Sequence, residues 1–404
     1  MTSRTSNPSD ADTDVGIEPH NDEVRFIDRL EHFTWAWFTL PMATGGLSLL
    51  LSAQIQPHTF HGLETIGKVV YIWDLFLFAV VTLCITYRFV HFPGTFVGSL
   101  THHTESLFAA TPLLSLASII AAIARHGIPS CGEWLIVVYR VLFWIYFAVS
   151  FIAAVGLYFL LFTSPSLKIS DMTPAWDLPI FPFMLSGTIA ACDQAVPMIV
   201  AGLTAQGLGM MISVLIYANY IHRMIQYGFP LPGSRAGMFI AVGPPSFTSL
   251  ALIGMANDFP TVYRAYFGGE DTTIQILKVG ATMTAVFIWS LSLWFFCISV
   301  LACLAARQEM RFRLNWYAFV FPNVGFTIAT ISIGKMFHSP AIGWVGSAMS
   351  MMLVITYLAV GFNHVRALLR RDILWEGKDE DTYWSELHHK THGHEANATK
   401  DGRV

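Results

Sequence analysis

The sequence predicts an all-α integral membrane protein with about ten transmembrane helices, arranged as five tandem helical hairpins. Of its 404 residues, 54% are hydrophobic and only 12% are charged, whereas an average soluble domain is about 25% charged. The apolar residues come in blocks of roughly 20, the length of helix that spans a hydrocarbon core of about 30 Å. Proline recurs inside every second block, which groups the blocks into pairs.

Ten apolar blocks account for most of the chain, and Pro and Gly residues typical of turns separate many of them. The blocks cover residues 33–53, 67–90, 103–124, 132–162, 178–195, 197–222, 236–257, 274–305, 315–336 and 341–369. We therefore expect a transmembrane transport domain over 33–370, between polar tails at 1–32 and 371–404. No basic stripe indicates nucleic acid as a partner, and the lipid bilayer is the expected surrounding.

The distribution of Lys and Arg predicts the side on which the tails lie, because cytoplasmic loops carry an excess of these residues. If both termini are cytosolic, the cytosolic segments hold 17 of the 23 Lys and Arg residues and the outer segments hold five. The remaining one, Arg140, falls inside a helix. We expect both tails in the cytosol.

Interior prolines mark the odd-numbered helices, while the even-numbered helices have none in their interiors. They are Pro41, Pro112, Pro182, Pro244, Pro245 and Pro322. An interior proline removes a backbone hydrogen bond and kinks a helix, and in lipid the freed carbonyl must be satisfied by protein or water. We expect the odd helices to line a central path and the even helices to face lipid or neighbouring subunits. The alternative is that proline is simply frequent in membrane helices.

Three of these segments resemble a known family. Residues 34–46, TWAWFTLPMATGG, resemble the first helix of fungal malic-acid (C4-dicarboxylate) transporters. Residues 237–252, GMFIAVGPPSFTSLAL, and 315–322, NWYAFVFP, resemble the seventh and ninth helices of the wider tellurite-resistance/dicarboxylate transporter superfamily, which includes the slow-type anion channels. The resemblance spans about 33–370 and leaves both tails unmatched.

The resemblance implies five helical hairpins around a central anion pathway, assembled as a homotrimer in the plasma membrane. It also implies that a phenylalanine before a proline on the ninth helix closes the pathway. Phe321 occupies that position here, before Pro322. The next residue is the polar Asn323, so we expect a pore lining that differs from that of simple inorganic-anion channels. The expected substrates are malate, succinate and fumarate.

A dicarboxylate needs compensating positive charge or dipoles on its way through a low-dielectric core. We expect a central site of hydroxyl groups near the prolines, because hydroxyls bind weakly enough for conduction. The candidates are Thr44, Ser186, Thr188, Ser246 and Thr248. A single hydroxyl can instead bond to its own helix.

Basic residues are candidates for the two mouths of the pathway. Arg88, His102 and His103 lie between the second and third helices, where they would concentrate anions at the cytosolic side. The alternative is that they snorkel and only fix helix depth. Lys335 is the outer counterpart, near the end of the ninth helix. Asp74 and Arg140 lie at similar depths in two even helices, and we expect a structural ion pair between them rather than a substrate role.

Other classes of function find little support. No motif of a serine hydrolase or of a zinc protease is present, and the five cysteines lack metal-ligand spacing. We expect neither an enzyme nor a cofactor nor a metal site. A sulfite efflux pump or an inorganic-anion channel of the same superfamily is the main alternative. The sequence leaves open whether transport is channel-like, uniport or proton-coupled, and whether Cys131 and Cys192 are bonded.

Overall fold

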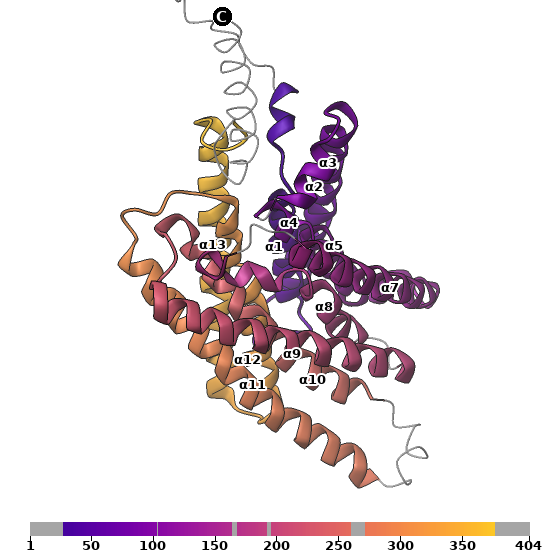
Figure 1. The fold of residues 1–404 in the computed structure, drawn as a ribbon. Coiled ribbons are helices and arrows are strands. Elements are labelled where there is room, and N and C mark those ends of the chain that lie inside the picture. Colours follow the sequence, from indigo (N-terminus) through magenta and orange to yellow (C-terminus); the bar gives the residue numbers. More distant parts are fainter. Residues whose placement is uncertain (1–26, 103, 164–167, 192–194, 260–270, 376–404) are drawn as a thin grey trace, which may run out of the picture.

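The computed structural model describes residues 27–102, 104–163, 168–191, 195–259 and 271–375, and these residues form helices and no strand (Figure 1). Eight helical segments are long and apolar enough to cross a membrane. The main helices are α1 (Thr39–Leu50), α2 (Leu63–His91), α5 (Thr111–Ala122), α7 (Trp134–Thr163), α8 (Phe181–Ala190), α9 (Val196–Tyr227), α10 (Gly243–Asp258), α11 (Asp271–Ala305), α12 (Phe321–Met336) and α13 (Pro340–Leu369). The short helix α3 (Thr95–Thr101) lies before the span that contains α5, whereas α4 (Glu105–Phe108) precedes α5 and α6 (Ile128–Cys131) follows it within that span.

Each predicted apolar block corresponds to one of the ten main helices, and successive helices form five hairpins. The hairpins are α1–α2, α5–α7, α8–α9, α10–α11 and α12–α13. The first helices of the hairpins form a closed ring, since α1 packs against α5, α5 against α8, α8 against α10, α10 against α12, and α12 against α1. The second helices surround the ring, each in contact with the inner helix of its own hairpin.

Burial separates the two sets of helices. In the spans that contain α5, α10 and α12, between 67% and 89% of the most apolar segment is buried inside the protein. For α2, α7, α9, α11 and α13 the corresponding share is between 17% and 33%. The expectation that odd helices form the centre and even helices face outward is confirmed. Large apolar side chains therefore cover the outside, which suits lipid.

The interior prolines start α-helices and do not kink them as expected. Each inner helix has two parts, a short first part and an α-helix that starts near the middle of the span. The first parts are η2 (Trp35–Phe38), α4, η5 (Pro174–Asp177), η6 (Pro232–Val242) and η8 (Leu314–Phe319), all 3₁₀ helices except α4. Each of the six interior prolines predicted from the sequence lies in the first turn of the second, α-helical part. The backbone N–H groups in the first turn of an α-helix have no intrahelical partner, so a proline at this position removes no hydrogen bond.

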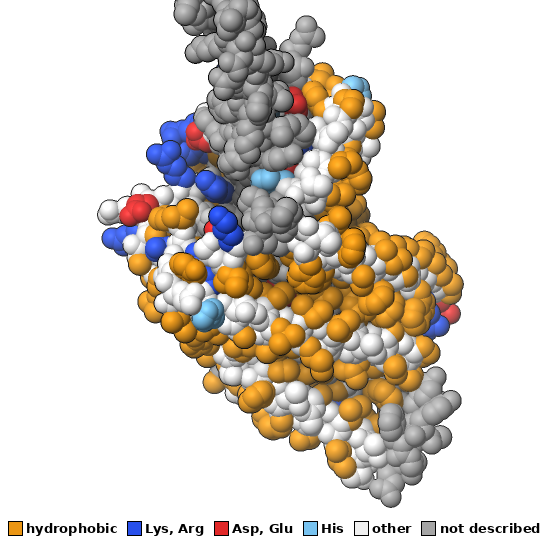
Figure 2. Space-filling model, viewed as in Figure 1, with side chains coloured by type: hydrophobic (Ala, Val, Ile, Leu, Met, Phe, Trp, Pro, Cys, Tyr) orange, Lys and Arg blue, Asp and Glu red, His pale blue; other side chains and the backbone are white. Residues whose placement is uncertain are grey.

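Charged side chains gather at one end of the molecule. Figure 2 shows Lys and Arg near the C-terminal end of α13, while hydrophobic side chains cover much of the remaining face. Exposed arginines at this end include Arg311, Arg313 and Arg370. Cys131 has a free thiol in α6, and Cys192 lies outside the described residues.

Candidate anion pathway

Three cavities lie inside the ring of inner helices. The first, of about 320 Å³, is a vestibule among the C-terminal ends of the inner helices, with Leu49, Ala121, Thr188, Gly254 and Lys335 in its wall. A second cavity of about 30 Å³ shares the first three of these residues with the vestibule. A third, of about 20 Å³, lies among the first residues of the second half-helices and includes Thr39 and Thr111.

Phe321 is the one described residue that lines both small cavities. It is the first residue of α12 and only 2% exposed. Its ring stacks on Phe247 of α10 with centroids 5.2 Å apart, and it meets Phe181 of α8 edge-on at 6.1 Å. The rings of Phe181 and Phe247 are themselves 5.7 Å apart. Three inner helices thus contribute one aromatic cluster between the two cavities.

A glycine on the next inner helix makes room for each ring of this cluster. A Cβ at Gly243 would lie 2.7 Å from Phe181 Cζ, and a Cβ at Gly325 would lie 2.6 Å from Phe247 Cε2. A Cβ at Gly46 would lie 3.0 Å from Phe321 Cδ2. These positions require glycine because the rings occupy the space that a side chain would fill.

Two cations line the vestibule. Lys335 is in the last turn of α12, and its Nζ donates to the carbonyl oxygen of Gln54 at 2.8 Å. Arg125 Nη1 donates to Gln54 Oε1 at 3.1 Å, so one residue holds both cations. Lys335, which we expected near the end of the ninth helix as the outer counterpart, lines the vestibule. Arg125 was missed as a site residue, although it directly follows the apolar block of an odd helix and could have been found by the reasoning applied to Lys335.

Most of the expected hydroxyls bond to their own helices. Thr44 donates to Leu40 O at 2.8 Å, Ser246 to Gly243 O at 2.8 Å, and Thr248 to Pro244 O at 2.7 Å. Ser186 is buried, and its Oγ has no partner among the described residues. Of the five, only Thr188 lines any of these cavities, namely the vestibule and the second cavity. The expectation of a central cluster of hydroxyls thus reduces to Thr188, because the others turn back on helix carbonyls or lie behind the cavity walls.

Asn323 points away from the small cavities. Its Nδ2 donates to Phe319 O at 3.0 Å. Its side chain lines an apolar groove with residues of α11 and α13, such as Val300 and Met349. Asn323 is two residues after Phe321, which places it on nearly the opposite face of α12, so the expected contact of Asn323 with the substrate is not supported.

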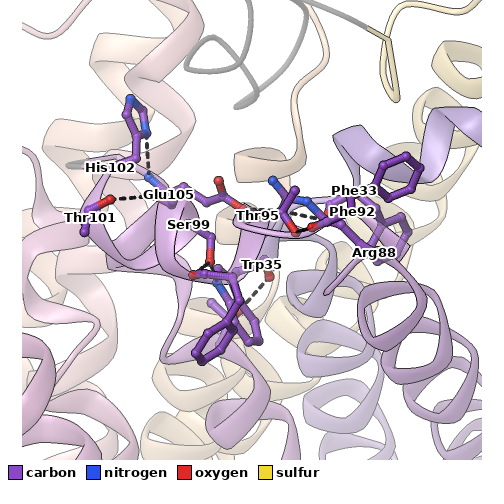
Figure 3. Close-up of polar contacts among 12 residues, drawn as sticks. Phe33, Trp35, Arg88, Phe92, Thr95, Ser99, Thr101, His102 and Glu105 are labelled. Atoms are coloured by element: carbon purple, nitrogen blue, oxygen red, sulfur yellow. Dashed lines mark hydrogen bonds and ion pairs between the residues drawn. The ribbon is translucent and has the colours of Figure 1, made fainter. Parts of the chain in front are cut away.

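Arg88 and Glu105 form a buried ion pair. Arg88 Nη1 is 2.6 Å from Glu105 Oε1 and also donates to Phe33 O at 3.0 Å. Arg88 is fully buried and Glu105 is 2% exposed. His102 is buried beside them, and its Nδ1 accepts the backbone N–H of Glu105 at 3.3 Å (Figure 3). His103 lies outside the described residues.

This pair corrects both interpretations of the cytosolic mouth. A snorkelling arginine would be exposed, and an anion-gathering arginine would carry an unbalanced charge. Arg88 instead ties the end of α2 to α4 and to the segment before α1, with its charge matched by Glu105. The sequence contained both residues, but their separation along the chain did not show that they would meet.

The ion pair expected between Asp74 and Arg140 is not formed. Neither carboxylate oxygen of Asp74 has a hydrogen-bond partner among the described residues, although Asp74 is fully buried. Arg140 is exposed on α7. The expectation assumed equal depth in the two helices, but depth does not fix the direction in which side chains point.

Comparisons with known proteins agree with this architecture. Residues 32–365 match the family model SLAC1, described as a voltage-dependent anion channel. The malic acid transport protein of Schizosaccharomyces pombe is 40% identical over 90% of this chain and 84% of its own length. A putative malic acid transport protein of the same yeast is 36% identical over 89% and 85%. The sulfite efflux pump SSU1 of Trichophyton rubrum is 27% identical over 85% and 94%.

The resemblance seen in the first, seventh and ninth helices is thereby confirmed, and the malic acid transport proteins are nearer in identity than the sulfite pump. The family match covers the ring of inner helices and all three cavities. The chain belongs to the SLAC1 family of voltage-dependent anion channels.

Proposed function

We propose that this protein carries C4-dicarboxylates such as malate, succinate and fumarate across the plasma membrane, through the ring of inner helices. The observation that carries the proposal is the position of Phe321, which lines the cavities on both sides of the aromatic cluster. The 40% identity to a malic acid transport protein supports the substrate class. In this conformation the small cavities hold about a water molecule each, so the pathway is closed.

The vestibule supports binding of a dianion. Arg125 and Lys335 supply two positive charges beside a space of about 320 Å³, and the acidic side chain of Asp258 in the same wall offsets part of this charge. Both cations already donate to Gln54, and they lie at helix C-termini, whose partial negative charge they offset. Their attraction for a free anion is therefore weakened, which favours passage over trapping.

Phe321 is proposed as the gate. A ring can close a narrow bore by excluding water, without any charge. The Phe321 ring contacts the aromatic rings of Phe181 and Phe247. On the side of α1 it faces Gly46, which has no side chain to hold the ring in place. A rotation of this one side chain would join the two small cavities and, through the second, the vestibule.

The substrate is tested with purified protein in liposomes. Uptake of labelled malate and of labelled sulfite is measured at the same voltage and pH, each with the other anion as competitor. Malate flux that exceeds sulfite flux, and that succinate and fumarate inhibit, is the expected result. Sulfite flux that exceeds malate flux would support the alternative of a sulfite pump, and the SSU1 similarity makes this the relevant competitor.

Orientation and assembly are proposals as well. With both termini in the cytosol, the vestibule opens outward, and tags on either terminus should be inaccessible in intact cells. A homotrimer would bury part of the apolar surface of the outer helices. Native mass spectrometry of the purified protein tests it, and a monomer in mild detergent would count against it.

A further inference from the structure

Asp74 is an ionisable residue that the proposed transport does not use. It lies in the middle of α2 and is fully buried, and neither carboxylate oxygen has a hydrogen-bond partner among the described residues. A charged carboxylate in such surroundings is costly, because no side chain of the described residues donates a hydrogen bond to it or pairs with its charge. Burial of this kind favours the neutral carboxylic acid.

Asp177 shows how the same protein treats another buried carboxyl group. It is also fully buried, but Ser213 Oγ donates to it at 2.9 Å and Tyr217 OH at 3.0 Å. These donors are on α9, the neighbouring outer helix. Asp177 thus has the partners of a structural residue, whereas the carboxylate oxygens of Asp74 accept no hydrogen bond from the described residues. An ionisable group kept at membrane depth without a partner indicates a function.

Asp74 lies next to the proposed pathway. A Cβ at Gly45 of α1 would fall on Ser118 Oγ of α5 and 2.6 Å from Asp74 Oδ2, so the carboxyl and hydroxyl groups share the space left by this glycine. Ser118 in turn lines the cavity between Phe321 and the vestibule. The Ser118 hydroxyl donates to Ser115 O at 2.8 Å, so the carboxyl group lies close to a residue of the cavity wall without a hydrogen bond to it.

Asp74 is also connected to Phe321 through two adjacent glycines. The carboxyl group fills the place of a side chain at Gly45, and the ring of Phe321 lies against the corresponding place at Gly46. The Asp74 carboxyl group and the Phe321 ring therefore contact the same turn of α1. If this turn of α1 moves away from Asp74 so that water can enter, the contact between Gly46 and the Phe321 ring changes as well.

On the basis of the proposed function, we propose that Asp74 is a proton-binding site that controls the gate, neutral when Phe321 closes the pathway and ionised when it is open. The reaction is the loss of one proton from the carboxyl group to water in the neighbouring cavity, and its return on closure. Water that enters the opened pathway would solvate the carboxylate.

The direction of the pH dependence follows from this arrangement. The closed conformation holds the proton more tightly than the open one, because only the open one solvates the charge. Stability of the closed form is therefore lost as pH rises, and flux increases by up to about tenfold per pH unit for one proton. Other titratable groups near Asp74 are Tyr71 on α2 and Tyr357 on α13, with His126 stacked on Tyr71. Helices α1 and α5 contribute no titratable residue.

The test compares wild-type protein with Asp74→Asn, which fixes the neutral form at nearly constant volume. Fluxes of malate and of nitrate are measured in liposomes over a pH series, nitrate because it does not itself titrate. Wild-type flux should rise with pH, and Asp74→Asn flux should stay low and flat. The control is Glu133→Gln, which removes an exposed carboxylate outside α2 and should retain the wild-type pH profile. An unchanged pH profile in Asp74→Asn would overturn the proposal.

A second measurement does not depend on transport. Infrared spectra at neutral pH should show the carbonyl band of a protonated carboxylic acid in Asp177→Asn, where the other buried carboxyl group is removed, but not in the double variant Asp74→Asn/Asp177→Asn. A band that is absent from Asp177→Asn, or that persists in the double variant, overturns the proposal even if Asp74→Asn transports poorly. If the proposed substrate is wrong, malate flux is absent at every pH, while nitrate flux and the band still report on Asp74.

Discussion

The ring of Phe321 on α12 lies where a side chain of Gly46 on α1 would begin, with a Cβ at position 46 only 3.0 Å from Phe321 Cδ2. The two helices are neighbours in the inner ring but are separated by most of the chain. The closed position of the ring thus depends on a missing side chain on another helix. Glycine at position 46 serves packing, since the backbone there is helical.

Gly46→Ala should therefore displace the ring and increase anion leak. A contact of 3.0 Å is too close for an unshifted methyl group, and overpacking costs about 1–3 kcal/mol. Anion flux and the midpoint of thermal unfolding measure the two effects. Gly156→Ala on α7 is the matched control, because no atom lies within 4 Å of its Cβ position. A Gly46→Ala protein with unchanged flux would show that the ring tolerates the methyl group without opening.

Neutralising the vestibule should weaken capture of the substrate. Arg125→Gln and Lys335→Gln each remove one of two charges beside the vestibule, and focused positive potential raises local anion concentration roughly tenfold or more. We expect malate flux to fall most at low substrate concentration and low ionic strength, where screening is weakest. Lys278→Gln on α11, outside the ring, is the control. Equal losses of malate flux in all three variants would show that the cations of the vestibule have no particular role in substrate capture.

Replacing Arg88 should destabilise the protein rather than change its selectivity. Arg88→Met leaves Glu105 buried without its partner, a change that typically costs about 3–5 kcal/mol. Flux per folded molecule should remain near wild type, and the double variant Arg88→Met/Glu105→Leu should recover part of the stability. Thermal unfolding and flux normalised to folded protein measure these effects. Normal stability combined with a flux loss confined to low ionic strength would instead indicate an anion-gathering mouth.

The architecture could be predicted from the sequence because membrane insertion depends on local properties. Block length and hydrophobicity define the spans, and the alternating prolines identified the inner helices. The role of the prolines was predicted incorrectly, since Pro112 and Pro322 start helices instead of bending them. The sequence shows that a proline interrupts a span, but not whether a 3₁₀ segment precedes it.

The site was less predictable because it depends on side-chain direction. Phe321 and Lys335 line cavities inside the ring of inner helices, and their roles stay predictions. Ser246 and Thr248 lie at the right depth but bond to their own helix. Asp74 and Arg140 do not pair, since depth in a helix does not fix the direction in which side chains point. Arg88 and Glu105 pair because the connection between α2 and α5 folds back, which no periodicity indicates.

Malate flux through Phe321→Ala protein tests the central claim most directly. Purified wild-type and variant proteins are reconstituted at equal density, and unidirectional flux of labelled malate is measured at fixed voltage and pH, together with thermal unfolding of both. A gate residue removed from the bore should leave the fold intact and raise malate flux above the wild-type value. A packing residue removed from the core should cost roughly 3–5 kcal/mol of stability. A markedly destabilised Phe321→Ala protein whose malate flux is not increased would contradict the account.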